Sequence, residues 1–194
     1  MKLQETIDCR SWAKLALVLC CLATAPALAR ADEPNASARD GARDFDFDIG
    51  VWHTHIRRIL DPFAGGQHVI ELDGVVTVSK VWDGRASLEE IEVDGPTGHW
   101  EGMNLFLYNP VAHQWSQSYS NSKVGTIGAP FVGEFRNGRG ELISPDTLDN
   151  RAVLVRAVWS NIETNAHDYS ESYSEDGGAT WQLSFAAHLI RAAS

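Results

Sequence analysis

The chain has 194 residues, which is enough for one domain of ordinary size and short for two. Its 26 acidic residues outnumber its 16 basic residues, so the net charge is −10 at pH 7. No basic cluster offsets this excess, and such a surface would repel phosphate backbones and anionic lipid headgroups. We therefore expect neither nucleic acid nor a membrane surface as a partner.

The first 31 residues have the composition of a secretory signal peptide. A basic start containing Lys2 precedes the apolar run 15–22, and Ala29 and Ala31 supply small side chains at the two positions that a signal peptidase reads. The run is shorter than the about 20 apolar residues that a spanning helix needs. We predict cleavage before Asp32, a periplasmic or secreted protein, and no membrane insertion after cleavage.

Cleavage at this position would change both the cysteine content and the charge. All three cysteines, Cys9, Cys20 and Cys21, precede the cut, so the mature chain would contain none. Disulfides, thiolate nucleophiles and cysteine-ligated metal sites are thereby excluded for the mature protein. Four basic and two acidic residues would also leave, and the remaining 12 basic and 24 acidic residues give a net charge of −12.

The rest of the chain predicts a flexible leader followed by one all-β domain. Residues 32–43 are small and polar, as in a leader, and the domain is expected to span 44–194. In this domain short alternating runs of β-branched and aromatic residues are separated by turn signals, without a sustained helical stripe. The clearest turn signals are Gly65-Gly66, Asp94-Gly95-Pro96, Asn137-Gly138, Ser144-Pro145-Asp146 and Asp176-Gly177-Gly178. One short helical turn is expected at 145–148.

Hairpin-joined strands of this kind favour a closed sheet. Closing the sheet removes its edges, and an up-and-down barrel of about 8–10 antiparallel strands does so with sequential neighbours only. A two-sheet sandwich is the alternative, because the number of strands does not separate the two architectures.

The first hairpin permits a prediction of register, in which Leu60 pairs with His68. Apolar residues then collect on one face and opposite charges on the other, as a half-solvated sheet requires. The predicted pairs are Arg58–Ile70, Ile56–Leu72, Thr54–Gly74 and Trp52–Val76 on the first face, and Arg57–Glu71 and His55–Asp73 on the second.

Two features resemble the calycin (lipocalin-like) signature. Gly50 and Trp52 form a Gly-x-Trp motif at the start of the first long strand, and the final strand ends in Arg191. The resemblance implies a barrel whose closed end holds the tryptophan beneath this arginine, in a cation–π contact. Leu183 and Phe185 share the parity of Arg191, so we expect them to face inward as well.

The longer stretch 44–191 resembles an uncharacterised family of exported bacterial proteins with calycin-like barrels. This resemblance implies a fold and no established activity. The segments that carry it are 44–52 (DFDFDIGVW), 81–85 (VWDGR), 107–110 (LYNP), 158–162 (VWSNI) and 174–181 (SEDGGATW).

Three histidines are candidate ligands of a metal or a haem. His53 and His55 point to one face of a strand, as a metal site would require, but their parity is opposite to that of Trp52 and no third ligand is evident. We expect surface histidines and no metal site. His188 lies where some calycin-like haem proteins carry their iron ligand, yet its parity opposes that of Phe185, so no cofactor is expected and haem remains an alternative.

The residues 174–180 fit the Ser-x-Asp-x-Gly-x-Thr pattern of the Asp box, which repeats in sialidase propellers. One copy in a chain of this length does not build a propeller. The mechanical interpretation is a tight hairpin in which Ser174 and Asp176 bind turn amides and Trp181 packs beneath them.

The acidic residues include one candidate for chemistry. Glu89, Glu90 and Glu92 put carboxylates on both faces of one strand, which is typical of a solvated edge. Glu171 lies between Tyr169 and another tyrosine at alternating positions, so it would face an apolar cavity and have a raised pKa. It could act as a general base, bind a polar ligand group or pair with a buried arginine.

These patterns favour an exported barrel that binds a small apolar or amphipathic molecule and is not an enzyme. The candidate lining residues are Trp115, Tyr119, Trp159, Tyr169 and Glu171. The alternatives are an isomerase, cyclase or hydrolase that uses a cavity carboxylate, a haem-binding barrel, and a purely structural or protein-interaction role. No thiol, Gly-x-Ser-x-Gly elbow, phosphate loop or dinucleotide motif is present in the expected mature chain, and no pattern indicates an oligomeric state.

Overall fold

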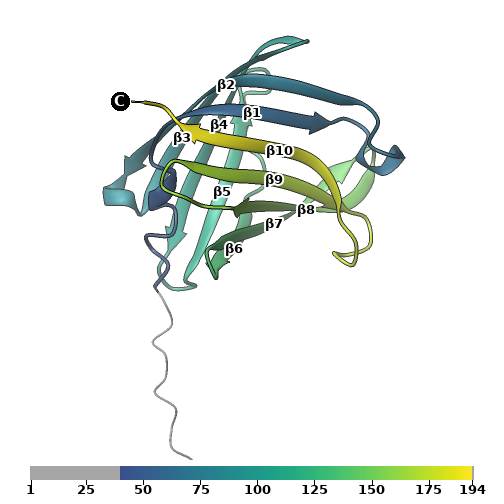
Figure 1. Cartoon of the computed structure of the whole chain (residues 1–194). Coiled ribbons are helices and arrows are strands. Elements are labelled where there is room, and N and C mark those ends of the chain that lie inside the picture. Colours follow the sequence, from purple (N-terminus) through teal and green to yellow (C-terminus); the bar gives the residue numbers. More distant parts are fainter. Residues whose placement is uncertain (1–39, 194) are drawn as a thin grey trace, which may run out of the picture. The chain divides into compact units, whose positions relative to one another are not determined.

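The computed structural model describes residues 40–193 as one closed antiparallel barrel (Figure 1). Its ten strands pair in sequence order, and the last strand pairs with the first. This confirms the predicted up-and-down barrel over the sandwich. The expected signal peptide lies outside the described residues. Between residues 40 and 193 no helix is long and apolar enough to cross a membrane.

Three short 3₁₀ turns accompany the strands. The turns are η1 (Asp46–Asp48), η2 (Pro62–Ala64) and η3 (Trp82–Gly84), and the strands are β1 (Gly50–Ile59), β2 (Val69–Val81), β3 (Ala86–Gly95), β4 (Gly98–Asn109), β5 (Gln114–Asn121), β6 (Phe131–Arg136), β7 (Arg139–Leu148), β8 (Arg151–Ser160), β9 (Ala166–Ser174) and β10 (Gln182–Arg191).

The first hairpin has the predicted register. Ile56 opposes Leu72 on the inner face, and His55 opposes Asp73 on the outer face. Trp52 and Ile56 are buried, whereas His53 and His55 are exposed. The pleat alone therefore separates the core residues of this hairpin from its solvated residues.

Strand β7 differs from the prediction, because it continues through the expected turn and helical segment at 145–148. Pro145 opposes Leu154 of β8, whereas pairing with β6 reaches only as far as Ile143. Beyond Ile143 one side of β7 has no ladder partner in β6. Strands tolerate proline at such positions, because no ladder hydrogen bond is lost there.

Strand β10 differs as well, because a register shift lies between Leu183 and Phe185. The irregularity turns Ser184 inward and leaves Leu183 42% exposed, so the expected inward position of Leu183 is wrong. A bulge inserts one residue and thereby reverses the alternation on one side of it. Phe185 still faces the interior.

At the closed end of the barrel Arg191 covers the indole of Trp52. The guanidinium carbon lies 3.9 Å from the ring centroid, and the guanidinium donates to the carbonyl oxygens of Phe47 (2.8 Å) and Ile49 (2.9 Å). The Trp52 Nε1 donates to the Asp48 carbonyl at 2.7 Å. The side chains of Trp52 and Arg191 thus fix η1 at the closed end of the barrel through these hydrogen bonds.

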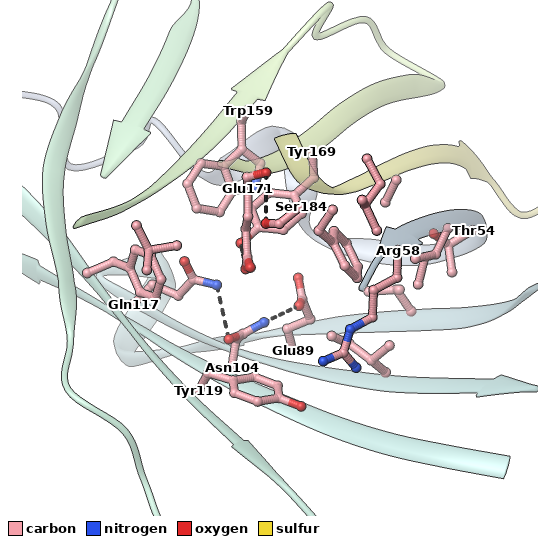
Figure 2. Close-up of a pocket in the computed structure, with 18 of the residues that line it drawn as sticks. Thr54, Arg58, Glu89, Asn104, Gln117, Tyr119, Trp159, Tyr169, Glu171 and Ser184 are labelled. Carbon is pink, nitrogen blue, oxygen red and sulfur yellow. Dashed lines mark hydrogen bonds between the residues drawn. The ribbon is translucent and has the colours of Figure 1, made fainter. Parts of the chain in front are cut away.

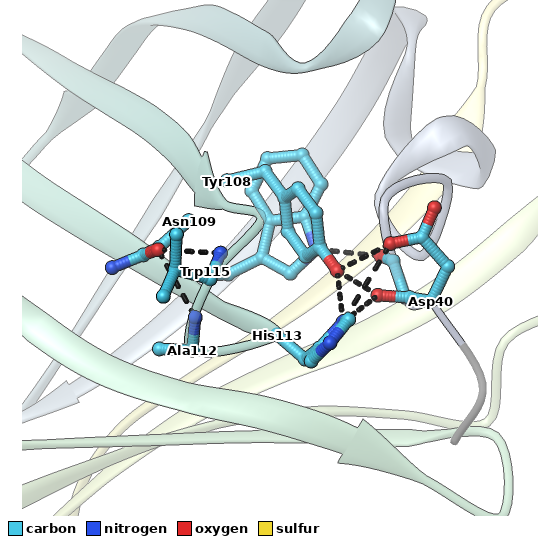
Figure 3. Close-up of polar contacts among 8 residues, drawn as sticks. Asp40, Tyr108, Asn109, Ala112, His113 and Trp115 are labelled. Carbon is cyan, nitrogen blue, oxygen red and sulfur yellow. Dashed lines mark hydrogen bonds and ion pairs between the residues drawn. The ribbon is translucent and has the colours of Figure 1, made fainter. Parts of the chain in front are cut away.

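The segment before η1 also contacts this end (Figure 3). The Tyr108 hydroxyl donates to the Asp40 carboxylate at 2.7 Å and lies 3.2 Å from His113 Nδ1. The indole of Trp115 donates to the Gly41 carbonyl at 2.9 Å. Residues 40–43, the described part of the expected leader, therefore contact the barrel.

Phe45 fills the centre of the base with an aromatic contact on every side. Its ring centroid lies 4.7 Å from Phe106, 4.8 Å from Phe135, and 5.0 Å from both Trp115 and Trp159. These five rings form the floor of the barrel, and the space above them is the candidate site.

The Asp-box segment is a hairpin turn, as predicted. The Ser174 hydroxyl accepts from the Gly178 amide at 2.8 Å, and the Asp176 carboxylate accepts from the Thr180 amide at 2.9 Å. The Trp181 indole donates to the Gly178 carbonyl at 3.0 Å. The polar side chains of this motif are thus used by the turn itself.

Candidate functional site

A cavity of about 390 Å³ occupies the barrel above the aromatic floor. Arg58, Leu60 and Leu148 line its outer end, which is the barrel end opposite to Arg191. The volume lies within the range of small-molecule pockets, which hold roughly 300–1,000 Å³.

Four of the five predicted lining residues face this cavity. Tyr119, Trp159, Tyr169 and Glu171 line it, whereas Trp115 does not. Trp115 points inward with the expected parity, but it lies near the start of β5 at the closed end and is packed in the floor. The alternation of side chains along the strand therefore predicted the correct face of the sheet for Trp115. It did not predict the position of Trp115 along the barrel axis.

Aromatic side chains form two walls of the cavity. Trp100 stacks with Tyr119, with ring centroids 6.1 Å apart and an interplanar angle of 20°. On another wall Tyr169 lies 4.9 Å from Trp159 and 5.9 Å from Phe185. Such faces suit a flat or cyclic apolar ligand.

A buried polar cluster interrupts these walls (Figure 2). The Asn104 amide donates to Glu89 Oε1 at 2.6 Å, and the Gln117 amide donates to Asn104 Oδ1 at 3.0 Å. All three side chains are buried and line the cavity. The second amide atom of Gln117, Oε1, has no hydrogen-bond partner among the described residues.

The position of Glu89 corrects the prediction of a solvated edge. Glu90 and Glu92 are exposed, but Glu89 is only 9% exposed and points inward. The signal was present in the sequence, because Glu89 shares its parity with the apolar residues Ile91 and Val93, which also face inward.

Two of the carboxyl groups that line the cavity, those of Glu89 and Glu171, have raised pKa values because both are desolvated. Burial raises the pKa of Glu89 to about 7, and the hydrogen bond from Asn104 opposes this shift only in part. Burial also raises the pKa of Glu171, against the lowering effects of the Tyr169 hydroxyl, which donates to Glu171 at 2.5 Å, and of the Arg58 charge. The direction predicted for Glu171 is therefore correct.

A second buried pair, which sequence reasoning missed, lies between the cavity and the base. His167 lines the cavity, and its Nε2 lies 3.3 Å from Asp48 Oδ1. Burial raises the pKa of Asp48 well above its usual range and lowers the pKa of His167 to about 4. The imidazole of His167 is therefore neutral at pH 7.

Arg58 extends from β1 at the exposed end of the cavity. Its charge lowers the pKa values of Glu171, Tyr119 and Tyr173, which places it near all three groups. Within residues 40–193 it makes no hydrogen bond or ion pair. The cavity therefore combines aromatic walls, a carboxyl group at depth and a cation at the rim.

Two of the three candidate histidines, His55 and His188, contact carboxylates on the outer face of the barrel. His55 Nδ1 lies 2.7 Å from Asp73, and His188 Nδ1 lies 2.6 Å from Asp168. Both rings are on the outer face, so His188 does not reach the interior as a haem ligand would. In the described part of the chain no group of three His, Cys, Asp or Glu side chains is placed to hold a metal ion.

The raised pKa of Glu89 predicts a pH-dependent stability. Below pH 4.5, the ordinary pKa, the group is protonated in both the folded and the unfolded chain. Between pH 4.5 and about 7 only the unfolded chain releases the proton, so the free energy of unfolding falls with rising pH, by about 3 kcal/mol in total. We expect Glu89→Gln to remove this loss.

The measurement is urea unfolding of both proteins at pH 5 and pH 8. The stability advantage of Glu89→Gln should grow by about 2–3 kcal/mol between the two pH values, since the other groups titrate in both proteins and largely cancel. Glu90→Gln, on the outer face of the same strand, should show no such growth. An advantage that stays constant with pH would contradict the burial argument.

Comparisons with known proteins give similarity of fold and no family. A scan against protein families found no match, and a search of curated proteins found none either. Among solved structures, the S-type phycobiliprotein lyase CPES from Guillardia theta is 11% identical, with a TM-score of 0.52 over 81% of this chain and 95% of that chain. A de novo designed fluorescence-activating β-barrel is 10% identical, with a TM-score of 0.42 over 79% of this chain and 99% of that chain. The first similarity supports the β-barrel fold of this chain.

Proposed function

We propose that this protein is an exported barrel that binds one small amphipathic molecule in its interior. The observation that carries the proposal is the cavity of about 390 Å³, whose aromatic walls surround the Glu89–Asn104–Gln117 cluster. A cavity with apolar walls and a few convergent polar groups is the usual form of a small-molecule site.

Two further parts of the proposal rest on sequence and fold. The composition of residues 1–31 supports export to the periplasm or the exterior after cleavage of a signal peptide. The segments that resemble those of the family of exported calycin-like barrels support membership in that family.

The proposal predicts that filling the cavity weakens binding of an apolar probe. Ala187 lines the cavity, while its neighbour Ala186 opposes Arg57 on the outer face. We expect N-phenyl-1-naphthylamine, a neutral probe, to gain fluorescence with the wild type and with Ala186→Phe, and to lose at least about tenfold in affinity with Ala187→Phe, since the new ring occupies its space. Thermal unfolding checks that both variants are folded. A probe that binds neither the wild type nor Ala186→Phe would refute an accessible apolar cavity.

A second candidate function is favoured by the raised pKa values of Glu89 and Glu171. A carboxyl that titrates near pH 7 is suited to proton transfer, so an isomerase, cyclase or hydrolase is the enzymatic alternative. In that case Glu171→Gln would abolish turnover and leave probe binding intact. Turnover that survives both Glu171→Gln and Glu89→Gln would exclude cavity carboxylates as the catalytic groups.

A further inference from the structure

We propose that the ligand of this cavity is an organic cation, a protonated amine on a flat or cyclic apolar body, whose ammonium group binds at Glu89 and Gln117. This inference rests on the proposed binding function and names the class of ligand for the same cavity.

The first argument is the direction of the buried hydrogen bonds. Asn104 donates its amide to Glu89, and its own oxygen accepts from the amide of Gln117. The amide groups of Asn104 and Gln117 thus both donate to other members of the cluster. The Oε1 atom of Gln117 remains a buried acceptor without a partner among the described residues, although the side chain is only 3% exposed and faces the cavity. A ligand that donates hydrogen bonds would satisfy it, whereas one that only accepts them would not.

Two more buried polar atoms next to the cavity have no partner within residues 40–193. They are Thr54 Oγ1 and His167 Nδ1, in side chains that are 4% and 1% exposed. Buried polar atoms normally have hydrogen-bond partners, so the orphaned atoms on these two side chains and on Gln117 point to a polar group of a ligand at this depth.

The second argument is the charge of the lining. Glu89, Glu171 and Asp146 bring three carboxyl groups, and Arg58 is the only lysine or arginine among the described lining residues. A bound cation would offset this excess of carboxylates, whereas an anion would add to it. The net charge of the whole chain, −10, also attracts a cationic ligand and repels an anionic one.

The third argument is the position of the carboxyl groups relative to the aromatic walls. In Figure 2 Glu89 and Glu171 come from different walls and point into the same space, which Tyr119 and Trp159 border. A cation held there would lie near aromatic faces, and such contacts are strongest where water is excluded. The depth of the cavity thus offers both kinds of partner that an organic ammonium group uses.

An anion bound by Arg58 is the competing interpretation. Arg58 is exposed at the rim, where its charge acts on Glu171, and Asp146 lies close enough to Glu171 to raise its pKa. The guanidinium therefore already lies near carboxyl groups, while Glu89 and Gln117 offer acceptor oxygens at depth. The two interpretations predict opposite charge preferences for ligands of the same shape.

The test compares three naphthalene probes of matched shape by isothermal titration calorimetry at pH 8. They are 2-(1-naphthyl)ethylamine, which is cationic, 2-(1-naphthyl)ethanol, which is neutral, and 1-naphthylacetate, which is anionic. We expect the amine to bind at least about tenfold more tightly than the alcohol, because a hydrogen bond between charged groups is stronger than one between neutral groups. The anion should bind most weakly.

The matched variants are Glu89→Gln and Glu90→Gln, which alter the inner and the outer face of one strand. Glu89→Gln should reduce the preference for the amine over the alcohol by about tenfold, and Glu90→Gln should leave the preference unchanged.

The outcomes separate this inference from the proposed function. An amine that binds no better than the alcohol, or an anion that binds best, overturns the organic-cation assignment and leaves the binding function standing. The same holds if N-phenyl-1-naphthylamine binds and none of the three naphthalene probes does. If N-phenyl-1-naphthylamine fails as well, the binding function itself is refuted.

Discussion

Arg191→Ala is expected to lower the free energy of unfolding by about 3–5 kcal/mol, because it removes several partly buried contacts at once. The guanidinium donates to the carbonyl oxygens of Phe47 (2.8 Å), Ile49 (2.9 Å) and Thr164 (3.0 Å) and covers Trp52 at 3.9 Å. Without it, these carbonyls lose charge-assisted donors and one face of the indole becomes open to water. Urea unfolding measures the loss.

Arg57→Ala is the matched control on the outer surface. The Arg57 Nε lies 3.7 Å from Glu71, and both side chains are more than half exposed. Such pairs contribute at most about 1 kcal/mol, so the control should be nearly neutral. Arg191→Lys should recover only part of the loss, since an ammonium group does not reproduce the planar fork of a guanidinium. Equal losses for Arg191→Ala and Arg57→Ala would show that Arg191 does not close the base.

Phe45→Ala is expected to cost about 3–5 kcal/mol, the range for an aromatic side chain removed from a packed core. The ring is 3% exposed and lies within 5.0 Å, centroid to centroid, of four other rings. Because these neighbours come from four different strands of a closed barrel, they cannot collapse freely into the space that the mutation leaves. The measurement is again urea unfolding.

Phe63→Ala provides the comparison for an aromatic residue at the opposite end. Phe63 lies in η2, is only partly buried, and its ring centroid is 6.4 Å from that of Tyr173. Its truncation should cost less than half as much, since water already reaches the side chain. If the two variants lose the same stability, Phe45 is not the centre of the floor.

Much of the candidate site follows from the alternation of residues along single strands. Tyr169 and Glu171 were expected to face inward from their spacing, and both line the cavity. Glu89 could have been assigned by the same rule, because Ile91 and Val93 share its parity. The nearby Glu90 and Glu92 obscured this signal, since several carboxylates close together in a strand usually indicate a solvated strand.

Other features of the site depend on contacts between distant strands. The buried side chain of His167 pairs with Asp48, from the turn before β1, whose Oδ1 lies 3.3 Å from its Nε2. Nothing adjacent to His167 in the sequence indicates this partner. The orientation of Leu183 was predicted wrongly for a related reason, since the register shift between Leu183 and Phe185 is a property of the pairing between β9 and β10.

The sequence by itself determined the side of the sheet on which most residues lie, and the pairing of the first hairpin from Trp52 to Val76. Both follow from the two-residue period of a strand, which is a local property. Only the tertiary structure decided the height of each residue along the barrel, because that height depends on the stagger that accumulates over all strands on closure. This stagger places Trp115 in the floor and brings Glu89 and Glu171, from β3 and β9, to the same cavity.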